Sequence, residues 1–125
     1  MKTLGLLCCA AALALGADGT AKYFDSPAKY FDKKVAPILT RRCLGCHNDE
    51  LKDGGISFQD RPSLLKGGGR GPAIVPGKPA ASMLVVALRH EGELQMPPGP
   101  KLPAKEIKTL TDWIRRGAVW GTRLR

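Results

Sequence analysis

Two cysteines and a histidine stand together in the stretch Cys43-Leu44-Gly45-Cys46-His47. This spacing places two thiols about one helical turn apart and an imidazole directly after them. Two thioether bonds can then reach the two vinyl groups of a porphyrin while the histidine presents a nitrogen to the iron. The motif therefore predicts one covalently bound haem c, attached through Cys43 and Cys46, with His47 as the proximal iron ligand.

Three other interpretations of the motif fit less well. A thioredoxin-like Cys-x-x-Cys usually lies near a βαβ pattern, which is missing around residues 43–47. A structural zinc site needs four ligands, typically in two Cys or Cys/His pairs. After the first twenty residues, only Cys43, Cys46, His47 and His90 are available, and the second half of the chain has no such pair. A disulfide between Cys43 and Cys46 would close so small a loop that it would constrain little.

The N-terminus has the layout of a secretory signal peptide. Lys2 is followed by an apolar run over residues 4–15, which is shorter than the roughly 20 residues that span a membrane. We expect residues 1–16 to be removed near Gly16-Ala17, with cleavage after Ala21 as the second choice. The protein is then periplasmic or otherwise exported, and an uncleaved N-terminal anchor is the alternative.

Charge restricts the partners. Cleavage would remove one lysine and no acid, so the formal net charge would fall from +9 to +8. Lysine and arginine are scattered, without a dense basic stripe and interleaved aromatics, so no nucleic-acid partner is expected. Redox partner proteins with acidic docking surfaces fit better, as does peripheral contact with an anionic membrane. The oligomeric state stays open.

Helical signals flank the motif. Ser26-Pro27 resembles an N-cap followed by proline at the first helical position, and apolar residues recur at helical spacing from Phe31 to Leu39. This predicts a helix that delivers the motif, with a kink or a fresh start at Pro37. Residues 48–79 are expected to be rich in loops.

Two more helices are expected in the second half of the chain. The first covers Pro79 to Arg89, and a second loop at 89–103 contains Met96-Pro97-Pro98. The last helix runs from about Ala104 to Arg116, and Gly117 supplies its stop.

The order of these motifs resembles a class I c-type cytochrome, and more narrowly the Planctomycete-type cytochrome c domain. The resemblance covers about Phe31 to Trp120. The stretches that carry it are VAPIL at 35–39, CLGCH at 43–47, GG at 54–55, LLKGG at 64–68, GPAIVPG at 71–77, SMLVVALRH at 82–90, MPP at 96–98 and WIRRGAVW at 113–120.

The resemblance implies a small all-α fold, in which about three main helices and long Gly/Pro-rich loops surround one covalent haem. The expected organisation is a signal peptide at 1–16, a lead-in at 17–30, a monohaem cytochrome c domain at 31–120 and a tail at 121–125.

The resemblance also suggests that Met96 is the distal iron ligand. A thioether is a soft ligand that favours ferrous iron and raises the reduction potential, and the prolines after Met96 stiffen its loop. Met83 is expected to fill core space instead. His90 stays open as a rival ligand, a surface residue or a partner for a haem propionate.

In class I cytochromes, a proline carbonyl accepts a hydrogen bond from the proximal histidine, and Gly71-Pro72 matches that position. Residues 67–69, all glycines, are expected to let the backbone approach the porphyrin closely. Arg70, Trp113 and Trp120 are candidate partners for the haem propionates, although both tryptophans can equally be core residues.

The predicted function is that of an exported monohaem cytochrome that moves single electrons between partner proteins, not that of an enzyme. Two alternatives belong to other classes. The domain can be a haem-bearing module or subunit of a larger exported oxidoreductase, or a haem sensor or peroxidase-like protein with a labile sixth ligand.

Overall fold

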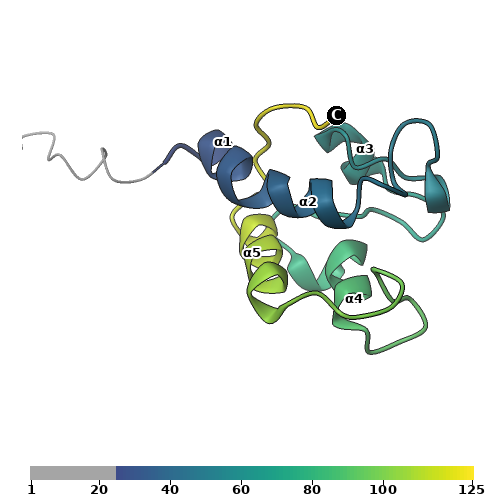
Figure 1. Ribbon diagram of the computed structural model, residues 1–125. Helices are drawn as coiled ribbons and strands as arrows, with labels where there is room; N and C mark the ends of the chain where they lie inside the picture. Colours follow the sequence, from purple (N-terminus) through teal and green to yellow (C-terminus); the bar gives the residue numbers. More distant parts are fainter. Residues whose placement is uncertain (1–24) are drawn as a thin grey trace, which may run out of the picture.

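The regular elements are helical throughout the computed structural model, which describes residues 25–125 (Figure 1). Its α-helices are α1 (Pro27–Tyr30), α2 (Ala36–Arg42), α3 (Arg61–Lys66), α4 (Met83–Arg89) and α5 (Ala104–Arg115). Within the described range no strand forms, and a single isolated bridge joins Gly68 to Gly71. The predicted all-α fold is confirmed. The expected signal peptide, residues 1–16, and residues 17–24 of the lead-in lie outside the described residues.

The first helix begins where the sequence predicts. Ser26 is the N-cap of α1, where its hydroxyl accepts a hydrogen bond from the backbone N–H of Lys29 at 3.3 Å. Pro27 occupies the first turn, where its missing N–H is not needed. Residues 27–30 therefore belong to the helix that carries the haem motif.

Pro37 interrupts the regular hydrogen bonding of this helix. The segment Phe31–Val35 between α1 and α2 is π-helical, and the N–H of Ala36 bonds to the carbonyl of Phe31. Pro37 then falls in the first turn of α2, because it has no N–H to donate and its ring would clash with the carbonyl four residues back. The helix thus changes from π-helical to α-helical hydrogen bonding next to Pro37, where the sequence predicts a kink or a fresh start.

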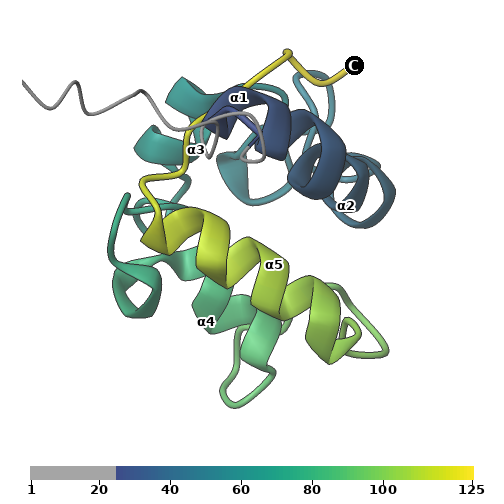
Figure 2. The ribbon, with the colours of Figure 1, turned by 90° about the vertical axis from the view of Figure 1, so that its left-hand side faces the viewer.

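An aromatic cluster joins the first helix to the last one. The ring centroid of Phe31 lies 5.6 Å from that of Trp113 in α5 and 4.1 Å from that of Trp120. Phe31 and Trp113 are almost fully buried. In Figures 1 and 2, α5 lies below the helix formed by residues 27–42 and beside α4.

The last helix has the predicted extent and stop. Its apolar stripe buries Leu110, Trp113 and Ile114, which places one face of α5 in the core. Gly117 follows with φ of +106°, a conformation that a residue with a Cβ adopts only under strain.

The predicted helix over Pro79–Arg89 is shorter in the structure. A 3₁₀ turn covers Pro79–Ala81, and the α-helix begins only at Met83. Ser82 between them is extended and fully buried, and its hydroxyl accepts from the N–H of Val75 at 2.8 Å and donates to the carbonyl of Lys78 at 2.9 Å. These bonds hold Ser82 outside the helix. The α-helix therefore begins at Met83 and not at Pro79, where the sequence predicts its start.

The short helix α3 was not predicted. The side chain of Asp60 caps it by accepting from the N–H of Ser63 at 2.9 Å, and Gly67 ends it at φ of +70°. Both capping signals are present in the sequence, but six residues are too few to show a helical apolar pattern.

Residues 121–125, expected as a tail, contact the domain. The N–H of Thr122 donates to Asp32 at 2.7 Å, and Leu124 is buried with 7% of its surface exposed. The backbone N–H of Leu124 donates to the carbonyl of Gln59 at 3.0 Å, while the side chain of Gln59 returns a bond to the carbonyl of Leu124 at 3.1 Å. The C-terminal segment therefore extends the folded unit past Trp120.

The C-terminal segment can lie against the first helix because Gly121 has no Cβ. A Cβ on Gly121 would come within 2.3 Å of a carboxylate oxygen of Asp32 and 2.7 Å of the carbonyl of Ala28. Gly121→Ala should therefore lower the free energy of unfolding by about 1–3 kcal/mol, as over-packing does elsewhere. Urea unfolding of the haem-loaded protein measures this.

Gly92→Ala is the matched control, because no heavy atom lies within 4 Å of the Cβ it would add. Equal stability of the Gly121→Ala variant and wild type would show that the C-terminal segment is not fixed at this contact.

Candidate functional site

The haem motif forms a turn at the end of α2. The N–H of Cys43 bonds to the carbonyl of Leu39 at 3.0 Å, and the N–H of His47 bonds to the carbonyl of Cys43 at 3.0 Å. Helix-like turns of this kind place residues three and four apart on one face. Cys43, Cys46 and His47 accordingly line the same cavity.

The two thiols differ in environment. Cys43 is half-buried, and burial raises the pKa of its thiol to about 12, with the nearby Arg42 guanidinium opposing the shift. At neutral pH the Cys43 thiol is therefore protonated in the folded domain. Cys46 is exposed at the surface.

The hydrogen bond of His47 fixes which ring nitrogen carries the proton. Nδ1 lies 2.8 Å from the carbonyl oxygen of Asp53. A carbonyl oxygen only accepts, so Nδ1 is the donor and the lone pair of the neutral ring is on Nε2. This is the tautomer that a histidine needs in order to bind a metal through Nε2.

The Asp53 carbonyl corrects the role expected for Pro72. The carbonyl oxygen of Pro72 accepts a hydrogen bond from the N–H of Met83 at 3.2 Å, and Pro72 is not among the residues that line the cavity. The loop after the motif turns back through Lys52 at φ of +43°, which brings Asp53 to His47 first. No sequence signal identifies this partner, because any residue type supplies a carbonyl.

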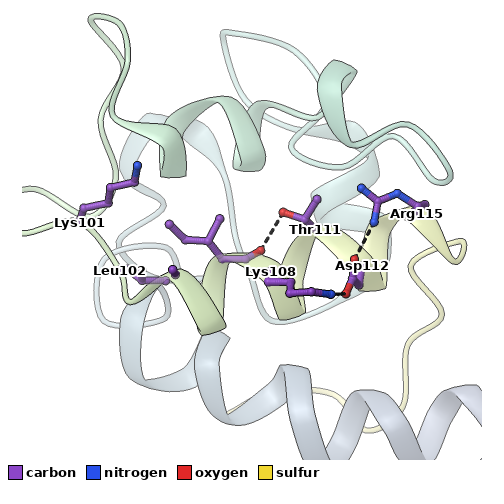
Figure 3. A pocket seen from close by; sticks show the side chains of 8 residues that line it. Lys101, Leu102, Lys108, Thr111, Asp112 and Arg115 are labelled. Carbon is purple, nitrogen blue, oxygen red and sulfur yellow. Dashed lines mark hydrogen bonds and ion pairs between the residues drawn. The ribbon is translucent and has the colours of Figure 1, made fainter.

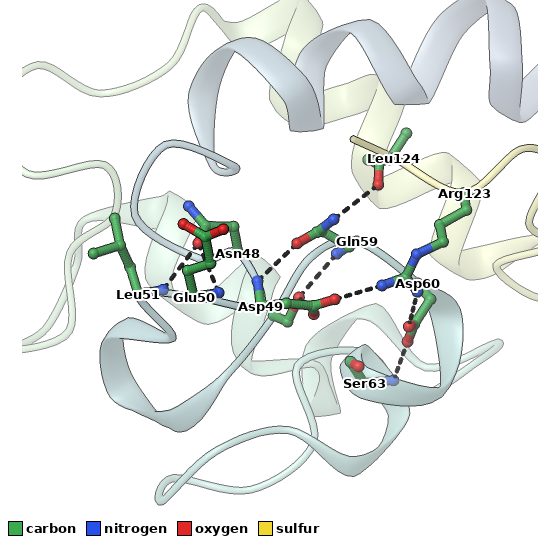
Figure 4. Close-up of polar contacts among 10 residues, drawn as sticks. Asn48, Asp49, Glu50, Leu51, Gln59, Asp60, Ser63, Arg123 and Leu124 are labelled. Atoms are coloured by element: carbon green, nitrogen blue, oxygen red, sulfur yellow. Dashed lines mark hydrogen bonds and ion pairs between the residues drawn. The ribbon is translucent and has the colours of Figure 1, made fainter.

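A polar network holds the chain that follows His47 (Figure 4). The side chain of Asn48 accepts from the N–H of Leu51 at 2.9 Å, and Gln59 accepts from the N–H of Asp49 at 2.7 Å. Arg123 forms ion pairs with both Asp49 and Asp60. The C-terminal segment is thereby connected to the loop that leaves the haem motif.

A further ion pair lies beside Cys43. The guanidinium of Arg42 contacts Glu106 at 3.0 Å and lowers the pKa of that carboxyl group, joining the end of α2 to the first turn of α5. Arg41 contacts the same carboxylate at 3.3 Å. The pairs are partly exposed, so they contribute more to the position of the two ends than to stability.

The cavity that the motif lines has a volume of about 530 Å³. Small-molecule and cofactor sites typically measure about 300–1,000 Å³ and are mainly apolar. Its apolar walls come from both halves of the chain and include Ile56, Phe58, Leu84, Leu88, Leu94 and Leu102.

Both methionines of the described chain line this cavity. Met96 reaches it from the loop before α5 together with Pro97 and Pro98, and Met83 reaches it from the first position of α4. Met83 is half-buried and lies at the cavity wall, so the expectation that it only fills the core is too simple. Two thioethers are therefore available to a group held by the motif.

The other residues singled out from the sequence divide between the cavity and its surroundings. Arg70 is exposed and lines the cavity, whereas neither tryptophan does. The indole N–H of Trp113 donates to the carbonyl of Val119 at 2.9 Å, so it is already satisfied. The indole nitrogen of Trp120 is buried without a partner. His90 does not line the cavity, and its Nε2 lies 2.9 Å from the carbonyl oxygen of Met96.

The glycines at 67–69 serve contacts within the protein as well as the cavity. A Cβ on Gly67 would lie 1.9 Å from the carbonyl oxygen of Gly71, and a Cβ on Gly68 would lie 2.1 Å from that of Gly54. Close backbone packing therefore requires these two glycines. Gly69 lines the cavity and has open space around it.

A second hollow of about 630 Å³ lies along the outer side of α5 (Figure 3). Three of its charged groups pair with one another, because Asp112 contacts both Lys108 at 2.5 Å and Arg115 at 2.6 Å. The residues that line it include no cysteine, histidine or methionine, so it lacks the ligands that an iron porphyrin needs.

The residues around the first cavity fit a covalently attached haem. The cavity is lined by two thiols with the motif spacing, by two thioethers and by apolar walls. It is also lined by a histidine whose Nε2 lone pair is available to the iron. A cationic side chain, Arg70, is present at the same cavity for carboxylate groups.

Comparison with known families supports this assignment. Residues 43–100 match the family model described as Planctomycete cytochrome C, and this range includes the motif, Arg70 and Met96. Searches among curated proteins and among solved structures gave no match. Cytochrome c domains bind haem covalently and typically serve in electron transfer. Residues 43–100 therefore match the Planctomycete cytochrome C domain that the sequence resembles.

Proposed function

We propose that the protein is an exported, monohaem c-type cytochrome that carries single electrons between partner proteins. The observation that carries this proposal is the shared cavity of Cys43, Cys46, His47 and Met96. The family of the domain supports the haem and its redox role. A single Cys-x-x-Cys-His motif in the sequence supports one haem per chain.

Each residue has a separate task in this proposal. Cys43 and Cys46 hold the porphyrin by thioether bonds, and His47 binds the iron through Nε2 while Asp53 fixes its tautomer. Met96 supplies the sixth ligand, and the apolar walls exclude water. When bound, the haem provides an iron that alternates between ferric and ferrous states.

The proposed partners are redox proteins with acidic docking surfaces. The formal net charge, +9 for the whole chain and +8 after the proposed cleavage, favours association with acidic surfaces. Arg42 and Arg70 are exposed at the cavity that would hold the haem. Steering of this kind weakens as ionic strength rises, because salt screens exposed charges over about 10 Å at 0.1 M.

Covalent attachment is tested by Cys43→Ser, Cys46→Ser and the double variant, each expressed with a c-type maturation system. Wild type should carry one haem per chain by pyridine haemochrome assay and intact mass, and each single variant at most one thioether. The haem-free double variant should be largely unfolded, because the apolar walls of the cavity would lose the porphyrin that covers them and long loops form part of these walls.

Two results would contradict this prediction. One is wild-type protein without covalent haem. The other is a cooperative, protease-resistant fold of the haem-free double variant.

The distal ligand is tested by Met96→Ala with Met83→Ala as the matched control, since both side chains line the cavity. Met96→Ala should keep the haem, because the motif is untouched, but lose the sulfur-to-iron charge-transfer band of the ferric protein. Its reduction potential should fall, because the soft ligand favours ferrous iron. Absorption spectra and redox titration measure both effects.

Met83→Ala should retain the band and lose some stability through the enlarged cavity. If the band instead disappears in Met83→Ala and survives in Met96→Ala, the assignment of the two methionines is reversed.

Export is proposed from the charged and apolar pattern of residues 1–16. No helix in the described part of the chain combines the length and apolar character that a membrane span requires. N-terminal sequencing of protein recovered outside the cytoplasm should start near Ala17 or Lys22. Full-length protein in the membrane fraction would favour an uncleaved anchor.

A further inference from the structure

In the loop between α4 and α5, the side chain of His90 bonds to the backbone of Met96. His90 follows α4 in the left-handed region, at φ of +55° and ψ of +30°, and is half-buried. Its Nε2 lies 2.9 Å from the carbonyl oxygen of Met96, six residues later. Because a carbonyl oxygen only accepts, Nε2 carries a hydrogen and donates it to Met96.

The backbone of Met96 is consequently held on both sides of its Cα atom. Its N–H donates to the carbonyl of Ala87, in the last turn of α4, at 3.0 Å. Its carbonyl accepts from Nε2 of His90 at 2.9 Å. The backbone N–H of His90 also bonds to the carbonyl of Ala87, at 3.3 Å. Both peptide groups that flank the Met96 side chain are thus fastened to the C-terminal end of one helix.

We infer that His90 is a positioning residue for Met96, which it holds through the carbonyl so that the thioether stays directed at the haem iron. This inference rests on the proposed function, in which Met96 is the distal ligand. A fixed Cα leaves the side chain fewer conformations to lose when sulfur binds, which strengthens the iron–sulfur bond. His90 itself is no ligand here, because it does not line the cavity and its Nε2 is already used.

The loop contains a suitable control bond. The side-chain amide of Gln95 donates to the carbonyl of Gly92 at 3.1 Å and to the backbone carbonyl of His90 at 3.5 Å. Neither bond involves the N–H or the carbonyl of Met96. Gln95→Ala therefore removes both side-chain hydrogen bonds of Gln95 while leaving the two attachments of Met96 in place.

The test compares His90→Asn, His90→Gln and Gln95→Ala in the haem-loaded protein. Asparagine tolerates the left-handed conformation, but its side chain is too short to place the amide where Nε2 lies. Glutamine extends further and carries an amide N–H that can replace the donor. The main readout is the affinity of the ferric protein for added imidazole, which competes with the Met96 sulfur for iron.

His90→Asn should bind imidazole about tenfold more tightly than wild type, the effect of about one lost hydrogen bond. Its sulfur-to-iron band should weaken and its reduction potential should fall. His90→Gln should restore most of the wild-type values, and Gln95→Ala should match wild type. A purely structural role would lower the midpoint of thermal unfolding without changing these three values.

Two outcomes overturn the positioning role alone. In the first, wild type has the band and His90→Asn binds imidazole with wild-type affinity. In the second, Gln95→Ala changes the affinity as much as His90→Asn, so that any loosening of the loop suffices. By contrast, a wild type without the band, or a band that survives in Met96→Ala, overturns the distal ligand of the proposed function.

Discussion

The packing of Phe31 against Trp113 is the contact on which the arrangement of the site depends. It joins the helix that ends at Cys43 to the helix that follows the Met96 loop, and Trp120 covers it from the C-terminal side. Aromatic contacts of this kind bury large areas and prefer defined ring geometries. Once the two helices meet there, the motif and the methionine loop approach the same cavity from opposite parts of the chain. The ion pair between Arg42 and Glu106 fixes the neighbouring helix ends in the same relation.

Local signals accounted for most of what the sequence predicted correctly. Ser26-Pro27 and Gly117 mark helix ends through their own capping and φ preferences, which do not depend on the remaining chain. The helix boundary at Ser82 was not predictable in this way. It depends on hydrogen bonds of the Ser82 hydroxyl with the N–H of Val75 and the carbonyl of Lys78, which form only in the folded protein. The haem motif is likewise local, whereas its surroundings are not.

The candidate site shows the same limit in its hydrogen bonds. A sequence pattern identifies Cys43, Cys46 and His47, but the carbonyl that meets Nδ1 depends on how the following loop turns, and it belongs to Asp53 instead of Pro72. That Met83 lines the cavity could be known only from the position of α4 in the structure. In the sequence, an apolar residue that faces the core and one that faces a cofactor produce the same helical pattern. The hydrogen bond between His90 and the carbonyl of Met96 likewise depends on how the loop folds, which no local sequence pattern indicates.

Backbone packing extends this control of the His47 ring to residues that do not contact His47. Gly68 can lie against the carbonyl of Gly54 only because it has no Cβ, which would come within 2.1 Å of that oxygen. Gly54 directly follows Asp53, so this contact braces the turn whose carbonyl selects the tautomer of His47. On the other side of the cavity, Ala87 and His90 hold Met96 by its two peptide groups. The two candidate iron ligands are thus oriented by main-chain carbonyls, and the glycine-rich loops allow the close approach that this arrangement requires.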